Sequence, residues 1–182
     1  MSRRTPFQAR VLSTAVASLA LVSTLCALET SPRVAFNQPL GAFDAGAVER
    51  AKAGAARWLR NPECLKVLTE FTDGEGRTLD RNLETWGMSA AEYVQTLSFR
   101  DGAAMANCDQ PRIELVTVRG LPRVYVCPMG VGALNGRFAR TQIQSPSLAE
   151  AMVIHEMLHT LGLGENPPSS FEITERVRAR CR

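Results

Sequence analysis

The sequence predicts an α+β domain, because helix-like and strand-like patterns occupy different parts of the chain. The first half carries helix signals such as Asn61-Pro62, a cap followed by a first-turn proline. From Arg112 apolar residues recur with the two-residue period of strands. A long apolar segment over 148–161 and a short helix-like segment over 169–180 follow. We therefore expect a helical N-terminal half, a small antiparallel-edged sheet, a buried helix and a short C-terminal helix.

The N-terminal half should contain four helices. Asp44 can cap the first, which runs to about residue 60, and Asn61 caps the second. Two shorter helices are expected at 79–86 and 90–98. Ser89, with glutamate three residues on, forms a capping box for the latter.

Two strands are expected over 113–118 and 123–127, joined by a turn that contains Gly120. They form a hairpin, and the strand near Tyr125 could bind an extended peptide by β-augmentation. The stretch 129–146 contains glycines and is expected to be a loop.

The last two helices each begin with a capping-box pattern. Ser147 and Glu150 should open a helix from Leu148 to about Leu161, and Ser169 and Glu172 should open the closing helix.

The N-terminus predicts export. Arginines 3, 4 and 10 precede an uncharged run over 11–28, with small residues near Ala27 where a signal peptidase could cut. Serines and threonines interrupt the run, which is short and weakly apolar for the alternative, a membrane anchor. We expect a signal peptide over 1–27, a tail over 28–43 and one domain over 44–182. The mature protein would be secreted or periplasmic, without stable membrane insertion.

The charge balance gives no reason to expect a polyanionic partner. The signal segment holds three of the 21 basic residues and none of the 18 acidic ones, which leaves 18 of each. A near-neutral mature protein lacks the excess positive charge of nucleic-acid or anionic-membrane binders. We therefore expect no nucleic-acid partner.

Four cysteines remain after signal removal, Cys64, Cys108, Cys127 and Cys181. An even number in an exported protein favours two disulfides, with three possible pairings. A cysteine zinc site is the alternative, but the chain has no CxxC pair and the spacings are long.

The most informative motif is His155-Glu156-Met157-Leu158-His159 in the apolar helix. Residues four apart lie on one helix face, so His155 and His159 can direct two imidazoles at one ion, with Glu156 beside them. Both histidines of the chain fall in this motif. Burying such a group without a partner would be costly, which favours a metal. Zinc takes neutral nitrogen ligands, activates water in an open position, and would make Glu156 the general base.

These residues resemble the HExxH zinc metallopeptidases, the zincins. Gly162, three residues after His159, resembles the metzincin form HExxHxxGxxH or Asp, although Glu165 stands at its last position and no Met-containing turn follows. The resemblance implies a zincin-like helix beneath the sheet and a substrate added to an edge strand. The C-terminal run also resembles a family of exported bacterial proteins that carries no assigned substrate.

The third zinc ligand has three candidates. Glu165 matches the metzincin-like position and follows two glycines that let the chain reverse. Glu172 would correspond to the gluzincin arrangement, but its capping box with Ser169 competes for the carboxylate. Glu175 is less well placed. We favour Glu165 over Glu172.

The sequence therefore predicts an exported zinc-dependent hydrolase, a metallopeptidase acting on a peptide or protein. One alternative is a binding or structural protein in which zinc serves stability alone. Another is a zinc amidase that acts on a non-protein amide. The sequence leaves the oligomeric state open.

Overall fold

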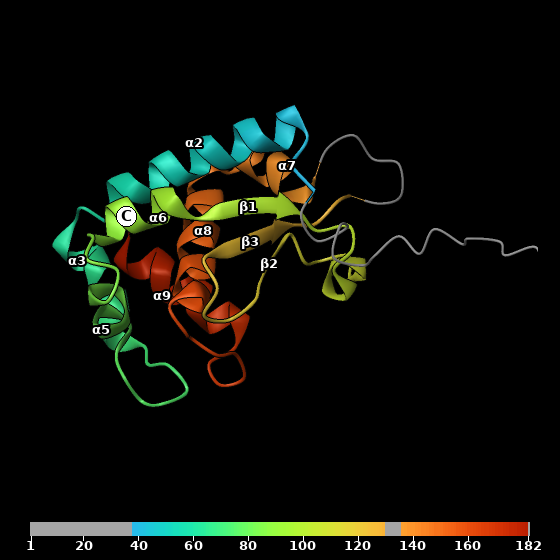
Figure 1. The fold of residues 1–182 in the computed structure, drawn as a ribbon. Helices are drawn as coiled ribbons and strands as arrows, with labels where there is room; N and C mark the ends of the chain where they lie inside the picture. The colour runs from blue at the N-terminus through green and yellow to red at the C-terminus, as the bar shows by residue number, and fades with distance from the viewer. Residues whose placement is uncertain (1–37, 130–135, 182) are drawn as a thin grey trace, which may run out of the picture. The chain divides into compact units, whose positions relative to one another are not determined.

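The computed structural model describes residues 38–129 and 136–181 (Figure 1). The expected signal peptide and most of the expected tail lie outside these residues. The described chain combines helices with a small sheet, which confirms the predicted α+β class. Within the described ranges, no helix is long and apolar enough to cross a membrane.

Helices make up most of the described chain. Those before the sheet are α2 (Ala42–Trp58), α3 (Pro62–Leu65), α4 (Val67–Glu70), α5 (Leu79–Glu84) and α6 (Ala90–Thr96). The later elements are the 3-10 helix η1 (Ala106–Asp109), α7 (Arg137–Gln144), α8 (Pro146–Thr160) and α9 (Ser170–Arg180). The predicted second helix is thus divided into α3 and α4, and Asn61 caps it as expected, accepting a hydrogen bond from the Glu63 amide.

The predicted cap of α2 was wrong. The helix begins at Ala42 after Gly41, and the Asp44 carboxylate instead accepts hydrogen bonds of 2.8 and 2.9 Å from the Gly136 amide. A tertiary partner therefore takes the place of the local capping interaction, and it joins the first turn of α2 to the residue that precedes α7.

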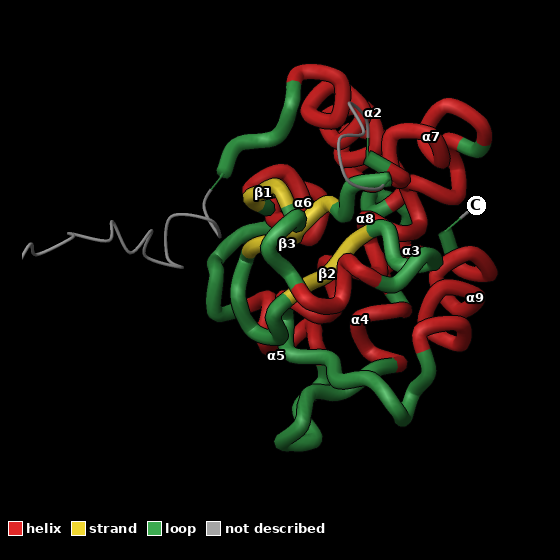
Figure 2. Tube along the Cα trace, turned by 90° about the vertical axis from the view of Figure 1, so that its right-hand side faces the viewer, coloured by secondary structure: helices red, strands yellow, loops and turns green. Residues whose placement is uncertain are grey.

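The sheet has three strands in the order β1-β3-β2, namely β1 (Ser98–Asp101), β3 (Arg123–Val126) and β2 (Leu115–Thr117). The antiparallel pairing of β2 and β3 confirms the predicted hairpin. The parallel pairing of β1 with β3 was not predicted. A helix was expected over 90–98, up to the first residue of β1, and no strand was expected after it. Figure 2 shows the strands side by side, with α2 and α7 toward one end of the view and α5 toward the other.

Two predictions around α8 were wrong. Residues 137–144, expected in a loop, form α7, whose Phe138 and Ala139 are fully buried although the segment is mostly polar. Helix α8 begins at Pro146, so Ser147 does not cap it, and Glu150 pairs with Arg57 of α2 at 3.4 Å.

Helix α8 is the centre of the hydrophobic core. Its Val153, Ile154, Met157 and Leu158 have no exposed surface. Helices α2, α6, α7 and α9 pack around it, and β2 lies against it as well. A helix surrounded by other elements is apolar on all sides, which explains the composition of this segment. The polar side chains it carries are therefore held in rigid surroundings.

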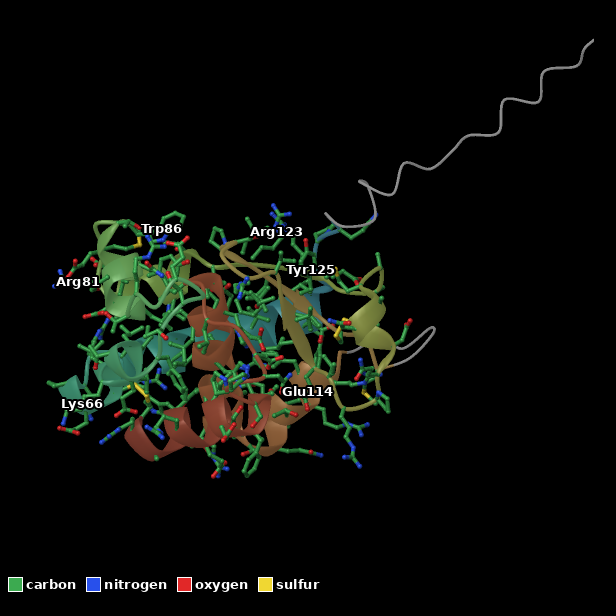
Figure 3. The ribbon with its side chains drawn as sticks, turned by 90° about the horizontal axis from the view of Figure 1, so that it is seen from below. Lys66, Arg81, Trp86, Glu114, Arg123 and Tyr125 are labelled. Atoms are coloured by element: carbon green, nitrogen blue, oxygen red, sulfur yellow. A yellow bond between two sulfur atoms is a disulfide. The ribbon has the colours of Figure 1, made fainter. Side chains whose placement is uncertain are left out.

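Both expected disulfides are present, and the structure selects one of the three pairings (Figure 3). Cys64 in α3 bonds to Cys181, which follows α9, and Cys108 in η1 bonds to Cys127, which follows β3. The bonds close loops with separations of 117 and 19 residues. Such bonds stabilise a fold and fit an oxidising, exported environment.

Candidate metal centre

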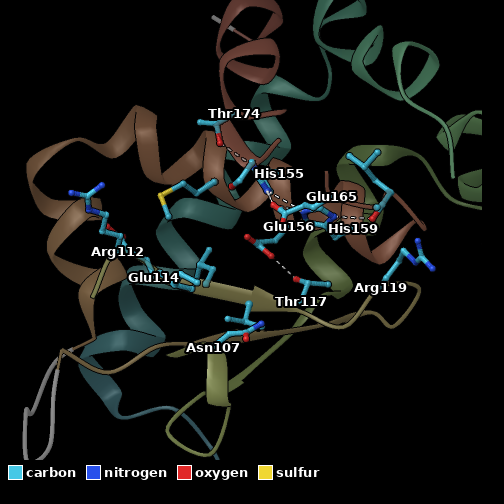
Figure 4. Close-up of a pocket in the computed structure, with 17 residues that line it drawn as sticks. Asn107, Arg112, Glu114, Thr117, Arg119, His155, Glu156, His159, Glu165 and Thr174 are labelled. Atoms are coloured by element: carbon cyan, nitrogen blue, oxygen red, sulfur yellow. Dashed lines mark hydrogen bonds and ion pairs between the residues drawn. The ribbon is translucent and has the colours of Figure 1, made fainter. Parts of the chain in front are cut away.

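His155 and His159 lie one turn apart on α8 and face the same cleft (Figure 4). Their Nε2 atoms are 3.0 Å apart, and only 4% and 9% of the two residues is exposed. The four-residue spacing therefore brings the two imidazoles together as the sequence predicted.

Glu165 joins the histidines from the loop after α8. Gly162 ends the helix with a φ of +110°, and a Cβ there would lie 3.1 Å from the Cβ of Asp73, so this turn favours glycine. The Glu165 Oε1 atom lies 3.7 Å from His155 Nε2 and 3.6 Å from His159 Nε2. The ligand atoms of the three residues all lie within 4.8 Å of one another, so the group could hold a metal ion.

The spacing of these three donors fits a tetrahedral ion. With metal–ligand distances of about 2.0–2.1 Å, two ligands of tetrahedral zinc are roughly 3.3 Å apart. The three observed separations of 3.0, 3.6 and 3.7 Å bracket that value. Two imidazole nitrogens and one carboxylate oxygen are also a donor set of the kind that catalytic zinc sites use.

The remaining ring nitrogens have partners that orient the imidazoles. His159 Nδ1 is 2.9 Å from the Leu163 carbonyl, which can only accept, so Nδ1 carries the proton and Nε2 keeps its lone pair. His155 Nδ1 is 2.9 Å from the Thr174 hydroxyl in α9, which can accept in the same way. Each imidazole can thus present an unprotonated Nε2 to the shared position.

Glu165 is suited to act as an anionic ligand. Its interaction with His155 lowers its pKa below the ordinary value of 4.5, although burial opposes this shift. The carboxylate is 41% exposed, far more than the imidazoles. The donor set therefore joins two rigid buried groups to one more accessible group.

Glu156 lies next to the three donors without belonging to their group. Thr117 of β2 donates a hydrogen bond of 2.6 Å to its Oε2 atom. No described residue forms a hydrogen bond with Oε1, and Glu156 borders the cleft (Figure 4). One carboxylate oxygen is thus fixed by the sheet, and the other can interact with a molecule in the cleft.

The other two candidate ligands lie elsewhere. Glu172 forms the predicted capping box, accepting a 2.8 Å hydrogen bond from the Ser169 amide. Glu175 pairs with Arg178 at 2.7 Å on α9. Of the three sequence candidates, only Glu165 is brought to the histidines.

The strand expected to bind a peptide was wrongly chosen. Tyr125 lies in β3, which has a neighbour on each side, and it is 95% buried beside the Cys108–Cys127 disulfide. The edge strands of the sheet are β1 and β2, and it is β2 whose Leu115 and Thr117 border the cleft. Cys127 donates its amide to the Glu114 carbonyl, so by alternation the N–H and C=O groups of Leu115 and Thr117 point away from β3. This edge is open to an added strand.

The cleft has a volume of about 500 Å³ and contains residues that the sequence did not single out. These are Thr117, Thr174, Asn107, Glu114, Arg112 and Arg119. Burial raises the pKa of Glu114, whose Oε2 atom is buried without a hydrogen-bond partner among the described residues. No local pattern could have identified these side chains, because each reaches the cleft through tertiary packing.

Comparisons with known proteins place this chain in no family: no family model matches it, and no curated protein or solved structure matches it significantly. The functional argument therefore rests on the site itself.

Proposed function

We propose that this protein is an exported zinc-dependent hydrolase, a metallopeptidase. The observation that carries the proposal is a general-base candidate, Glu156, directly beside a group of three metal donors at the wall of a cleft. A purely structural metal site has no use for such a carboxylate. Zinc is the favoured ion because His155, His159 and Glu165 supply two imidazole nitrogens and one carboxylate oxygen.

Zinc, when bound, would polarise a carbonyl oxygen and lower the pKa of a water molecule toward about 7. Glu156 would accept the proton of the attacking water at Oε1 and transfer it to the leaving nitrogen of the amide. Thr117 would hold Oε2 during both transfers, since it already donates to that atom. The buried imidazoles and the packed helix would keep the carboxylate at a fixed distance from the reacting group.

The open edge of β2 would hold the substrate backbone. An extended peptide could pair with the free N–H and C=O groups of Leu115 and Thr117. Because Thr117 also touches Glu156, a peptide bound along this edge would pass next to the general base. This arrangement favours a peptide over other amides as the substrate.

Export of the protein is part of the same proposal. The two disulfides fit an oxidising compartment, and the basic and uncharged N-terminal segment is typical of a secretory signal.

The proposal is tested by zinc analysis and peptide-library digestion of three proteins, the wild type, Glu156→Gln and Glu172→Gln. Glu172 is the matched control because it is a glutamate of the same C-terminal region that belongs to a helix cap. We expect about one zinc per chain in all three and cleavage by the wild type and the control alone. Absence of cleavage by the wild type would favour a non-catalytic zinc protein, and cleavage by Glu156→Gln at the wild-type rate would exclude Glu156 as the general base.

A further inference from the structure

Arg119 lies at the end of the cleft near His159, in the turn between β2 and β3 (Figure 4). The amide of the next residue, Gly120, donates a hydrogen bond of 3.0 Å to the His159 carbonyl. The turn is therefore attached to the last turn of α8, and the backbone of Arg119 has a fixed position relative to the metal donors.

The guanidinium of Arg119 lies in a slot between two glycines. A Cβ on Gly164 would lie 3.2 Å from its Nη1 atom, and a Cβ on Gly74 would lie 3.6 Å from it. The loops that contain these glycines are joined by a β-bridge between Asp73 and Leu163. Because Gly164 directly precedes Glu165, the guanidinium lies next to the loop that carries this candidate metal donor.

No carboxylate of the described chain neutralises this guanidinium. Arg119 forms no salt bridge with any described residue, and it is exposed. Asp73 is engaged by Arg77 and Asn82, and Glu165 by the histidines. Arg119 also borders two further hollows of about 570 and 460 Å³. It is thus a positioned cation that faces open space on several sides.

The direction of β2 indicates which part of a substrate would meet Arg119. The strand runs from Leu115 to Thr117, toward Arg119. A strand added antiparallel to β2, the commoner arrangement, runs the opposite way, so its N-terminal residues would lie toward Arg119. Residues after the scissile bond would lie toward Arg112, at the other end of the cleft (Figure 4).

We propose that Arg119 is a specificity-determining residue that selects peptides with an acidic side chain on the N-terminal side of the cleaved bond. This inference rests on the proposed peptidase function, which supplies the substrate backbone and its direction. Guanidinium groups pair with carboxylates in bidentate geometry, and such a contact at the rim of a binding site contributes mainly to specificity.

The test uses peptide pairs that differ only by Glu or Gln at one position, on either side of the cleavage site, with a free or amidated C-terminus. We expect the wild type to prefer Glu on the N-terminal side by roughly three- to tenfold in kcat/KM, and less at high salt. Arg119→Gln should remove this preference, and Arg119→Glu should favour Lys at the same position. Arg112→Gln is the matched control, an exposed cleft arginine at the opposite end, and should keep the preference.

The same pairs are measured for binding in the Glu156→Gln background, where no turnover is needed. Preferential binding of the Glu peptides without any cleavage by the wild type would defeat the hydrolase proposal but would still support Arg119 as the residue that selects acidic peptides. Cleavage without the preference, or a preference retained by Arg119→Gln, would overturn this inference alone. Selection for a free C-terminus or for Glu after the cleaved bond would also overturn it. If no peptide is bound or cleaved, both proposals fail.

Discussion

The histidines and Glu165 reach the same position from two very different parts of the molecule. His155 and His159 project from a helix that is buried on all sides, and 4% and 9% of these residues is exposed. Glu165 lies on a loop and has a 41% exposed side chain. The comparison teaches that rigidity and access are divided between two structures, since the helix fixes the imidazoles while the loop completes the donor set.

The largest effect should follow from removing a helix-borne donor. His155→Ala or His159→Ala should each abolish stoichiometric zinc binding, because two remaining ligands bind the ion too weakly. Zinc analysis after dialysis of the purified variants measures this effect. One zinc per chain in either variant would contradict the assignment of the helix donors.

Loss of the loop-borne donor should have a smaller effect. Glu165→Gln should lower zinc affinity by about 100-fold, more than the loss of most outer partners, because the amide oxygen is a weaker ligand. Glu172→Gln is the control, and it should cost only about 1 kcal/mol at the start of α9 without changing zinc affinity. Competition with a chelator gives both affinities. The reverse pattern would make Glu172 the third ligand.

The contact between Thr174 and His155 should have a smaller effect still. Thr174→Val removes the hydroxyl beside His155 Nδ1 and should lower zinc affinity by about tenfold, since the imidazole loses the partner that orients it. Thr174→Ser keeps the hydroxyl and should retain the wild-type affinity. Equal affinities for the two variants would mean that helix packing alone orients this ring.

The smallest effect concerns the stability of the loop that carries Glu165, and it depends on pH. Hydrogen bonding to Asn82, together with other donors, lowers the pKa of Asp73, whose residue also forms a bridge to Leu163. A lowered folded-state pKa means that the carboxylate stabilises the fold above its unfolded pKa of about 4, and that this stability is lost as the pH falls. Zinc-free Asp73→Asn should therefore have a lower free energy of unfolding than the zinc-free wild type at pH 7, and this difference should be smaller at pH 3.

Urea unfolding of both proteins at the two pH values measures this difference. If the difference in the free energy of unfolding between wild type and Asp73→Asn stays constant from pH 7 to pH 3, the charge of Asp73 does not stabilise the loop.

The features that depend on the local sequence alone could be predicted. The spacing of His155 and His159 identified the helix that carries two candidate metal donors, and the two-residue period identified the β2–β3 hairpin. Capping-box patterns were a weaker guide: Ser169 and Glu172 form one, whereas Ser147 and Glu150 do not, because Glu150 pairs with Arg57 instead. A local pattern fails where a distant residue offers a better partner.

The rest of the site depends on tertiary structure. The sequence limited the third donor to a few glutamates, and only the folded loop brings Glu165 to the histidines. Thr117 and Arg119 carry no local signal, because their roles depend on how the hairpin packs against α8. The disulfide pairing likewise required the positions of α3, η1 and the C-terminus.

The central claim is that Glu156 acts as a general base beside a zinc ion, and the most direct measurement compares wild type with Glu156→Gln. Zinc content, thermal unfolding and cleavage of the best library peptide are determined for both proteins. We expect equal zinc content, similar stability and a loss of kcat by at least 100-fold in the variant, since the amide cannot accept the proton of water. Wild-type kcat in a zinc-loaded Glu156→Gln protein would contradict the account.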